Sequence, residues 1–516
     1  MPNWWTIVHS ASPPYLVEML TKLISFANIG LQCEKITVEI GTVYGEKPHM
    51  FIVGLGDTAV RESEQRVKMA LRSGGLRFPT GKVITVNLAP ANLRKAGPRY
   101  DLAIALGLLI VNGSLLIDKE ELADMAFLGE LALDGSLRHI TGVLPATIAC
   151  RENGISTIVV PSVNAPEAAL VPGMNVIGAD SITDLVEILR GERSPDIIAP
   201  PACSPTNFLG IDFADVRGQE HAKRALEIAA AGGHNVLLSG APGAGKTLLA
   251  KAFSGILPPL THEESIEVTQ IYSIANLLPE DLPLVQKRPF RLVHHTASGV
   301  SIVGGGQIPG PGEISLAHKG VLFLDELAEF PSQVLEVLRQ PLEDRQITIT
   351  RAHGTVTFPA DFIMIAAMNP PQFSASTAMK IQRHISAPLL DRIDLTIDVQ
   401  PVPIEDLQKA PRKDMDTSAQ ILERVLKARI LQAERYKDLP ISTNKEMNVK
   451  HIDTLCPLNK EASLLLRQAA ERLDLSARSY HRMIKVARTI ADLGGEKNIE
   501  VPHVAEALQY RQSIGI

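Results

Sequence analysis

Short β-branched runs alternate with helical spacing over the first part of the chain. The apolar spacing predicts a helix over Thr58–Ser73 that ends at Gly74-Gly75. Three strands are predicted around this helix, at Lys35–Ile40, Met50–Val53 and Val83–Leu88. A further series of strand and helix patterns follows at 131–133, 155–160 and 185–189. The alternation predicts an α/β or α+β domain over residues 23–190.

The pattern changes twice after residue 190. Residues 191–208 are rich in proline and have no apolar period, which predicts a linker. Residues 209–402 return to α/β alternation, and from about Ser418 the pattern is purely helical, which predicts a helical domain over 403–516. Residues 1–22 fit neither pattern and are treated as an unassigned extension.

Composition narrows the class of protein. Of the 516 residues, 45% are apolar and 21% are charged, which is typical of a soluble protein that can bury a sizeable core. No apolar run reaches the roughly 18 residues of a membrane helix, no secretory signal is visible, and the four cysteines lie far apart. We therefore expect a cytoplasmic protein without membrane contact. The net charge of −6 means that any nucleic-acid surface must be local.

A glycine-rich loop lies between a predicted strand and a predicted helix. The strand reads Asn235–Leu238 and the helix begins after the loop, near Leu248. The loop consists of Gly240, Ala241, Pro242, Gly243, Ala244, Gly245, Lys246 and Thr247. In this context the pattern is a P-loop, whose backbone amides hold phosphate oxygens at a helix N-terminus. Lys246 is expected to reach the β- and γ-phosphates of ATP, and Thr247 to bind Mg²⁺.

Two later strands end in polar residues that suit ATP hydrolysis. An apolar strand ends at Asp325 and Glu326, where Asp325 is expected to hold hydrated Mg²⁺ and Glu326 to polarise the attacking water. A second apolar strand ends at Asn369, whose amide can position that water. Asn369 is also an ordinary turn residue before Pro370-Pro371, so the amide alone does not decide its role.

Two arginines are candidates for stabilising the transition state. Arg392 stands between Asp391 and Asp394, so it is either an arginine finger, a role often supplied by a neighbouring subunit, or part of a salt bridge. Ser476 is a predicted N-cap of a helix that carries Arg478 in its first turn. Arg478 can reach a nucleotide or belong to a solvated basic face.

The chain resembles the ComM/YifB competence proteins, which are AAA+ ATPases of the magnesium-chelatase-like group. The resemblance covers nearly everything after residue 23. It is carried by the segments 51–55, 57–63, 86–91, 288–291, 294–296, 311–318 and 475–478. It implies an AAA+ core with a helical lid, in which Asp325 and Glu326 are Walker B, Asn369 is sensor 1, Arg392 is the arginine finger and Arg478 is sensor 2. It also implies a homo-hexameric ring.

The resemblance also implies functions for two other segments of the chain. About 80 residues separate Thr247 from Asp325, more than a crossover of about 30 residues needs, and they include a candidate pore loop at Val303–Gly306. A hairpin is predicted from Ile347–Arg351 and Thr355–Phe358, with Arg351 and His353 near its tip. These two side chains suit a DNA backbone inside a ring, although an ordinary surface hairpin has the same pattern.

The N-terminal domain looks like the Lon-protease C-terminal fold without its chemistry. After Gly97-Pro98 the chain has no nucleophilic serine, and the segment 142–146 has no lysine, so we expect no protease activity. A basic series makes the domain a candidate duplex-binding collar, and the same residues also suit solvated helix faces. The series is Arg61, Arg66, Lys68, Arg72, Arg77, Lys82, Arg94, Lys95 and Arg99.

The function implied is that of an ATP- and Mg²⁺-dependent hexameric motor acting on single-stranded, duplex or branched DNA. Such a motor drives branch migration or unwinding while DNA is integrated during natural transformation. A chelatase-type motor that inserts Mg²⁺ into a porphyrin is the first alternative, and the Lon-like domain weighs against it. A protein-remodelling chaperone is the second, and it is weakened because Val303–Gly306 lacks the aromatic residue that usually grips polypeptide.

Overall fold

The computed structural model describes residues 19–44, 49–196, 198–199, 210–279, 282–306, 309–351, 354–369, 385–403 and 416–511. The chain divides into two compact units. The first comprises Met1–Ala202 together with Tyr272–Leu284, and the second comprises Cys203–Ile271 and Val285–Ile516. No helix in the described ranges has both the length and the apolar character needed to span a membrane.

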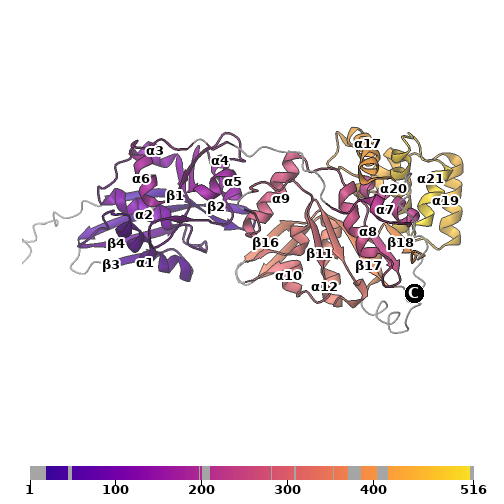
Figure 1. Cartoon of the computed structure of the whole chain (residues 1–516), viewed down its shortest axis with the longest axis horizontal. Coiled ribbons are helices and arrows are strands. Elements are labelled where there is room, and N and C mark those ends of the chain that lie inside the picture. Colours follow the sequence, from indigo (N-terminus) through magenta and orange to yellow (C-terminus); the bar gives the residue numbers. More distant parts are fainter. Residues whose placement is uncertain are drawn as a thin grey trace, which may run out of the picture. The chain divides into compact units, whose positions relative to one another are not determined.

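A seven-stranded mixed sheet forms the first unit (Figure 1), in the order β3-β4-β2-β1-β5-β8-β9. The strands are β1 (Met19–Ile29), β2 (Gln32–Tyr44), β3 (His49–Val53), β4 (Lys82–Ala89), β5 (Met125–Phe127), β8 (Thr157–Pro161) and β9 (Asn175–Ala179). A small hairpin adds β6 (Glu130–Leu131) and β7 (Leu137–Arg138). β1, β2 and β4 pair antiparallel, and the remaining pairs are parallel.

The helices of this unit follow from local sequence signals. They are α1 (Thr58–Ser73), α2 (Asp101–Val111), α3 (Lys119–Ala123), α4 (Val143–Glu152), α5 (Ala165–Ala168) and α6 (Ile182–Leu189). The Asp57 side chain caps α1 by accepting from the Val60 amide at 2.9 Å, and Gly75 leaves the helix with φ +70°. The predicted bounds of α1 are confirmed. α2 is apolar on all sides because it lies buried against β1 and β2.

Two features of the first unit differ from the sequence expectation. Residues 19–22 were placed in an unassigned extension, but they begin β1, which pairs with β2 from Met19↔Thr42 to Ile29↔Gln32. In addition, Tyr272–Leu284 belongs to this unit, where the Ser273 hydroxyl donates to the buried Glu167 carboxylate at 2.5 Å. The sequence pattern predicted neither the pairing of residues 19–22 with β2 nor the contact between Ser273 and Glu167.

Three members of the basic series form contacts inside this unit. The prediction that they belong to an open DNA-binding surface is therefore wrong for these three. Lys95 is fully buried and its ammonium donates to the Pro90 carbonyl. Arg99 is buried and donates to Asn28 Oδ1 at 2.6 Å and to the Thr141 carbonyl at 2.8 Å. Arg66 forms a two-pronged pair with Asp101, at 2.7 and 3.1 Å.

The second unit contains a five-stranded sheet in the order β11-β14-β17-β10-β18, and all of its neighbouring strands pair in parallel. The strands are β10 (Val236–Gly240), β11 (Phe290–Val293), β14 (Val321–Leu324), β17 (Ile363–Met368) and β18 (Leu395–Val399). Two small ribbons pair β12 (Gly304–Gly305) with β13 (Gly310–Pro311) and β15 (Gln346–Arg351) with β16 (Gly354–Pro359).

The helices of the second unit begin with α7 (Glu220–Gly232), α8 (Lys246–Phe253) and α9 (His262–Ile274), of which residues 272–274 belong to the first unit. Shorter helices follow: α10 (Gly299–Val303), α11 (Glu313–Leu316), α12 (Ser332–Val337), α13 (Arg339–Asp344) and α15 (Ala387–Leu390). Parallel strands with helical crossovers form the mixed α/β architecture that the sequence predicted.

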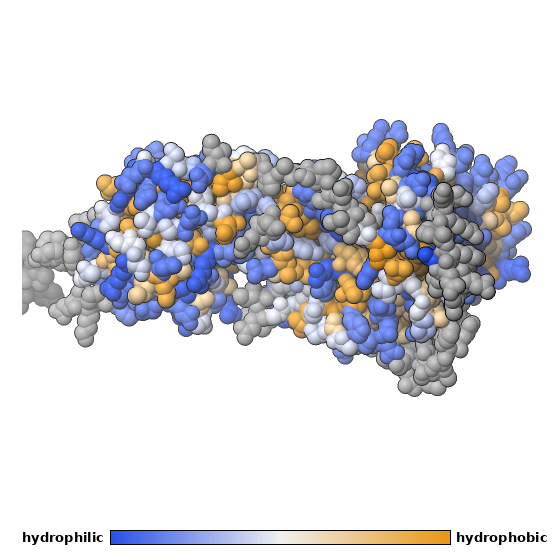
Figure 2. All heavy atoms as spheres, in the orientation of Figure 1, coloured by the Kyte–Doolittle hydropathy of each residue, from blue (hydrophilic) through white to orange (hydrophobic). Residues whose placement is uncertain are grey.

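The end of the chain is helical, as expected from Ser418 onward. Its helices are α17 (Ser418–Tyr436), α18 (Val449–Leu455), α19 (Lys460–Arg472), α20 (Ala477–Leu493) and α21 (Val501–Gln509). They share one apolar core with β10, β17 and β18, and Figure 2 shows mainly hydrophilic side chains on their outer surface. The buried carboxylate of Asp492 joins α17 to α20, because it accepts from Arg435 at 3.0 Å and from Arg488 at 3.1 Å.

Asp101→Asn is expected to destabilise the first unit. The carboxylate is fully buried, and its neutralisation leaves the guanidinium of Arg66 with only the longer ion pair to the exposed Glu62, at 3.8 Å. The loss should lie near the lower end of the about 3–5 kcal/mol that breaking a buried pair costs, since Arg66 keeps some solvent contact. Urea unfolding measures the change, with amide exchange in α2 reporting on this unit.

Asp118→Asn is the matched control, because Asp118 is exposed and its side chain forms no cap bond to α3. A similar small change in both variants would contradict the structural role of the Arg66–Asp101 pair.

Candidate nucleotide-binding site

The candidate site lies where three parallel strands end. β14, β17 and β10 are consecutive neighbours in the sheet, with Val321 beside Ile363 and Val236 beside Ile365. Their carboxyl ends therefore meet at one edge of the sheet, which is where α/β proteins bind ligands. The P-loop follows β10, Asp325 follows β14, and Asn369 follows β17.

The P-loop turns sharply between β10 and α8. Gly243 and Gly245 adopt φ +79° and +92°, a region that other residues enter at a cost. α8 begins at Lys246, so the loop ends at a helix N-terminus whose free amides favour anions. A cavity of about 350 Å³ opens here, lined by the loop, by Asp325 and Glu326 and by the end of β17. The glycine-rich turn at a helix N-terminus is an arrangement that suits phosphate oxygens.

The Lys246 side chain is one of the groups that line this cavity. It donates to the Gly240 carbonyl at 2.6 Å, to the Ala241 carbonyl at 2.9 Å and to Asn369 Oδ1 at 3.1 Å. Burial lowers the pKa of Lys246, and the nearby carboxylates of Asp325 and Glu326 oppose that shift. A lysine held by these acceptors is suited to a highly charged anion.

Thr247 and Asp325 form a pair of hard oxygen donors. The Thr247 hydroxyl donates to Asp325 Oδ2 at 3.3 Å, and the Glu326 amide donates to Asp325 Oδ1 at 3.0 Å. Mg²⁺ in nucleotide sites binds one or two protein oxygens and completes its shell with phosphate oxygens and water. The two side chains present fit that donor set, so they are the residues that would hold Mg²⁺.

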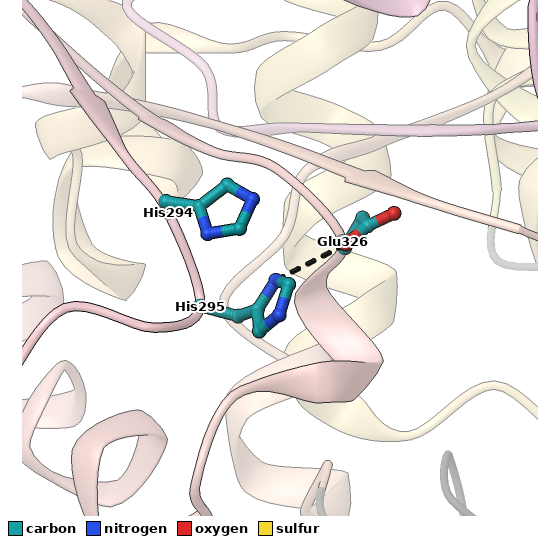
Figure 3. Close-up of side chains that lie close together, drawn as sticks. All are labelled: His294, His295 and Glu326. Atoms are coloured by element: carbon teal, nitrogen blue, oxygen red, sulfur yellow. Dashed lines mark ion pairs between the residues drawn. The ribbon is translucent and has the colours of Figure 1, made fainter.

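Glu326 projects into the same cavity from a strained position. Its backbone adopts φ +55°, and its carboxylate is half exposed. His295 Nδ1 lies 3.0 Å from Glu326 Oε2 (Figure 3), and His295 follows β11, the strand beside β14. The imidazole is therefore the nearest basic neighbour among the ion pairs of this carboxylate. The ligand atoms of His294, His295 and Glu326 lie within 4.8 Å of one another. The sequence segment 294–296 contributed to the resemblance, but no role for these histidines was inferred from it.

Arg392 and Arg478 do not line this cavity. Arg392 follows α15, and Arg478 lies in the first turn of α20, which Ser476 caps as predicted. Arg392 shows none of the ion pairs with Asp391 or Asp394 that its sequence position suggested. Both arginines instead contact Glu343 of α13, at a second cavity of about 680 Å³.

The predicted hairpin is confirmed as β15 and β16, which pair from Gln346↔Pro359 to Arg351↔Gly354. Arg351 is exposed, and its guanidinium lies so near Gly305 that a Cβ there would be 2.9 Å from it. The hairpin and the glycine segment Val303–Gly306 are therefore neighbours. His353 lies outside the described residues.

Fold and site together define a P-loop protein of the magnesium-chelatase-like AAA+ group. Three family models agree: "Magnesium chelatase, subunit ChlI" matches residues 212–407, "Subunit ChlI of Mg-chelatase" matches 38–164, and "Magnesium chelatase, subunit ChlI C-terminal" matches 415–511.

Relatives that match over nearly their whole length show which family within this group the chain belongs to. The chain is 44% identical to competence protein ComM of Haemophilus influenzae, over 96% of this chain and 98% of that one. It is 40% identical to YifB of Salmonella typhimurium, an uncharacterized protein, over 94% of this chain and 96% of that one. The 67 kDa magnesium-chelatase subunit of Chlorobaculum parvum is 26% identical over 49% of this chain and 38% of its own length. The chain belongs to the ComM/YifB family.

Lys246→Ala and Glu326→Gln are expected to separate nucleotide binding from turnover. Lys246→Ala should weaken ATP binding about 10- to 100-fold, the value of one charge-assisted hydrogen bond. Glu326→Gln should retain ATP binding and lose about 10²- to 10⁴-fold in turnover, because a positioned base is removed. Titration with a fluorescent ATP analogue and a phosphate-release assay measure the two effects.

Lys251→Ala is the control, since Lys251 lies exposed on the same helix. Normal hydrolysis by the Glu326→Gln chain would show that another group activates the water.

Proposed function

We propose that the chain is an ATP-hydrolysing DNA motor that works as a homo-hexameric ring. In this proposal it drives branch migration or unwinding while DNA is integrated during natural transformation. The observation that carries the ATP-dependent part is the convergence of Lys246, the Thr247–Asp325 pair, Glu326 and Asn369 on one cavity at one sheet edge. The DNA-dependent part is supported by the match over the whole chain to a relative named for competence.

Each side chain has one task in this mechanism. The P-loop amides and Lys246 bind the phosphates, so the γ-phosphate replaces the carbonyl and amide oxygens that Lys246 contacts now. Mg²⁺, when bound at Thr247 and Asp325, neutralises charge that develops on the phosphates. Glu326 polarises the attacking water, and Asn369 positions it as sensor 1.

The domains have separate tasks in this proposal. Residues 19–190 form an inactive Lon-like domain, with the start corrected to that of β1, and residues 191–208 link it to the ATPase core at 209–402. Residues 403–516 form the helical lid that carries Arg478. The motor works in the cytoplasm, and DNA passes the hairpin β15–β16 and the neighbouring glycine segment. The exposed guanidinium of Arg351 at Gly305 supports this path.

A chelatase-type ATPase that inserts Mg²⁺ into a porphyrin is the alternative that the comparisons support most. All three matching family models are named for magnesium chelatase. The match to a chelatase subunit nevertheless covers about half of this chain, whereas the competence protein is matched over nearly all of it. The DNA motor is therefore preferred.

Arg351→Ala is expected to lower DNA-stimulated ATP turnover more than basal turnover. The arginine is not among the residues that line the phosphate cavity, and it lies at the end of a separate ribbon, so its loss should remove a DNA phosphate contact and leave hydrolysis intact. The ATPase rate with and without forked DNA, measured at several salt concentrations, reports both quantities. The wild-type affinity for DNA should fall steeply with salt, and the variant should show a shallower slope.

Lys427→Ala is a suitable control, because Lys427 is an exposed lysine on α17 that pairs with Glu423. Equal losses of basal and stimulated turnover in the Arg351→Ala chain would remove the hairpin from the DNA path.

Arg392→Ala is expected to keep ATP binding and lose about 10³-fold or more in turnover, the value of an arginine finger. Arg392 lies outside the cavity of its own P-loop, so we propose that it serves the neighbouring subunit. Co-expression with the Lys246→Ala chain should then restore partial activity, because some mixed rings place an intact P-loop beside an intact Arg392.

Turnover by co-expressed and singly expressed chains measures this complementation. Mixed rings no more active than either parent would show that Arg392 acts within its own subunit.

A further inference from the structure

One carboxylate, that of Glu343, holds both candidate arginines. Arg392 comes from the turn after α15 and Arg478 from the start of α20, and Glu343 lies near the end of α13. Arg478 Nη2 donates to Glu343 Oε1 at 3.0 Å, and Arg392 Nη2 donates to Glu343 Oε2. The two guanidinium groups are therefore brought together around a single anionic group.

The contacts with Glu343 leave both guanidinium groups able to bind another anion. Within the described part of the chain, Arg392 Nε is buried and has no hydrogen-bond partner. Glu343 and Arg478 are about half exposed, at 51% and 49%, so their ion pair is accessible to solvent and weak. The two arginines lower the pKa of Glu343, Arg392 most strongly, so the carboxylate is ionised at neutral pH.

The other Lys and Arg side chains that line this cavity already bond to groups of the surrounding fold. Four such side chains line its wall of about 680 Å³. These bonds run from Arg345 to Glu446 (2.7 Å), from Lys445 to Asn235 Oδ1 (2.9 Å), from Arg482 to the Ile393 carbonyl (2.6 Å) and from Lys485 to the Lys445 carbonyl (2.9 Å). Arg392 and Arg478 thus share one ion-pair partner, a carboxylate that is about half exposed.

We propose that Glu343 is a displaceable counter-ion, which keeps Arg392 and Arg478 together until the terminal phosphate of an ATP held by a second copy of the chain replaces it. The inference rests on the proposed action of Arg392 on a neighbouring subunit. A phosphate offers more oxygens and more charge than a carboxylate, so it can take both guanidinium groups from Glu343. In the absence of that phosphate, Glu343 stops the two cations from repelling each other and from binding other anions.

The first test measures anion binding without relying on hydrolysis. The full chain with Lys246→Ala, which weakens the P-loop site, is titrated with tripolyphosphate in a calorimeter at low salt. Adding Glu343→Gln should tighten binding by about 2- to 30-fold, because one or two exposed ion pairs no longer compete. Adding Arg392→Ala and Arg478→Ala as well should abolish the gain.

Glu336→Gln in the same Lys246→Ala background is the matched control. Glu336 is a half-exposed glutamate on the neighbouring helix α12, and it pairs with Arg339 at 2.6 Å instead of with the two arginines. Glu336→Gln removes the same charge but no partner of Arg392 or Arg478, so it should leave tripolyphosphate binding unchanged. Equal gains in affinity from Glu336→Gln and Glu343→Gln would show that net charge alone causes the effect, and would overturn the proposal. The absence of any gain from Glu343→Gln would overturn it as well.

The second test identifies the source of the phosphate. A Glu326→Gln chain loaded with ATP is mixed with the Lys246→Ala chain, and their association is followed by sedimentation velocity. Glu343→Gln in the Lys246→Ala chain should strengthen ATP-dependent association, since its arginines are then free for the partner's nucleotide. Tighter tripolyphosphate binding without tighter association would overturn the second copy as the source. Neither test requires ATP turnover. A chain that fails to hydrolyse ATP therefore still tests whether Glu343 is a displaceable counter-ion.

Discussion

The parallel pairing of β14, β17 and β10 is the constraint on which the candidate site depends. Asp325, Asn369 and Lys246 lie far apart in the sequence, and each directly follows one of these strands or the loop after it. Parallel register puts all three strand ends at one edge, so that Lys246 reaches Asn369 at 3.1 Å and Thr247 reaches Asp325 at 3.3 Å. Strands shifted by one residue would turn these side chains to the opposite face.

The same arrangement leaves part of the machinery outside the phosphate cavity. Arg392 and Arg478 are held on another wall of the unit, and a carboxylate occupies them there. An isolated chain therefore has the groups that we propose bind phosphate and activate water at one cavity, and the two arginines at another. Assembly of several copies is the simplest way to bring the two surfaces to one nucleotide, and it would make turnover depend on the ring.

Sequence could predict the parts of this structure that have local causes. Asp57 as a cap and the Gly74-Gly75 end define α1, and the glycines of the P-loop define its turn, because each signal lies within a few residues of the element it shapes. The residues themselves suggested candidate roles for Asn369, Arg392 and Arg478, and the resemblance named these expected roles as sensor 1, arginine finger and sensor 2. What sequence missed depends on distant partners. His295 beside Glu326 and Glu343 between two arginines arise only when the strands and helices pack. For the same reason Lys95 and Arg99 read as surface cations, although buried carbonyl and amide oxygens hold them.

The central claim is that ATP hydrolysis by this chain moves DNA strands. The most direct measurement is the release of a labelled strand from a forked or three-stranded DNA branch by the wild-type chain, with ATP and with a non-hydrolysable ATP analogue. The account predicts strand release with ATP alone, and none with the analogue or with the Glu326→Gln chain. Steady ATP hydrolysis with no strand release from any branched substrate would contradict it.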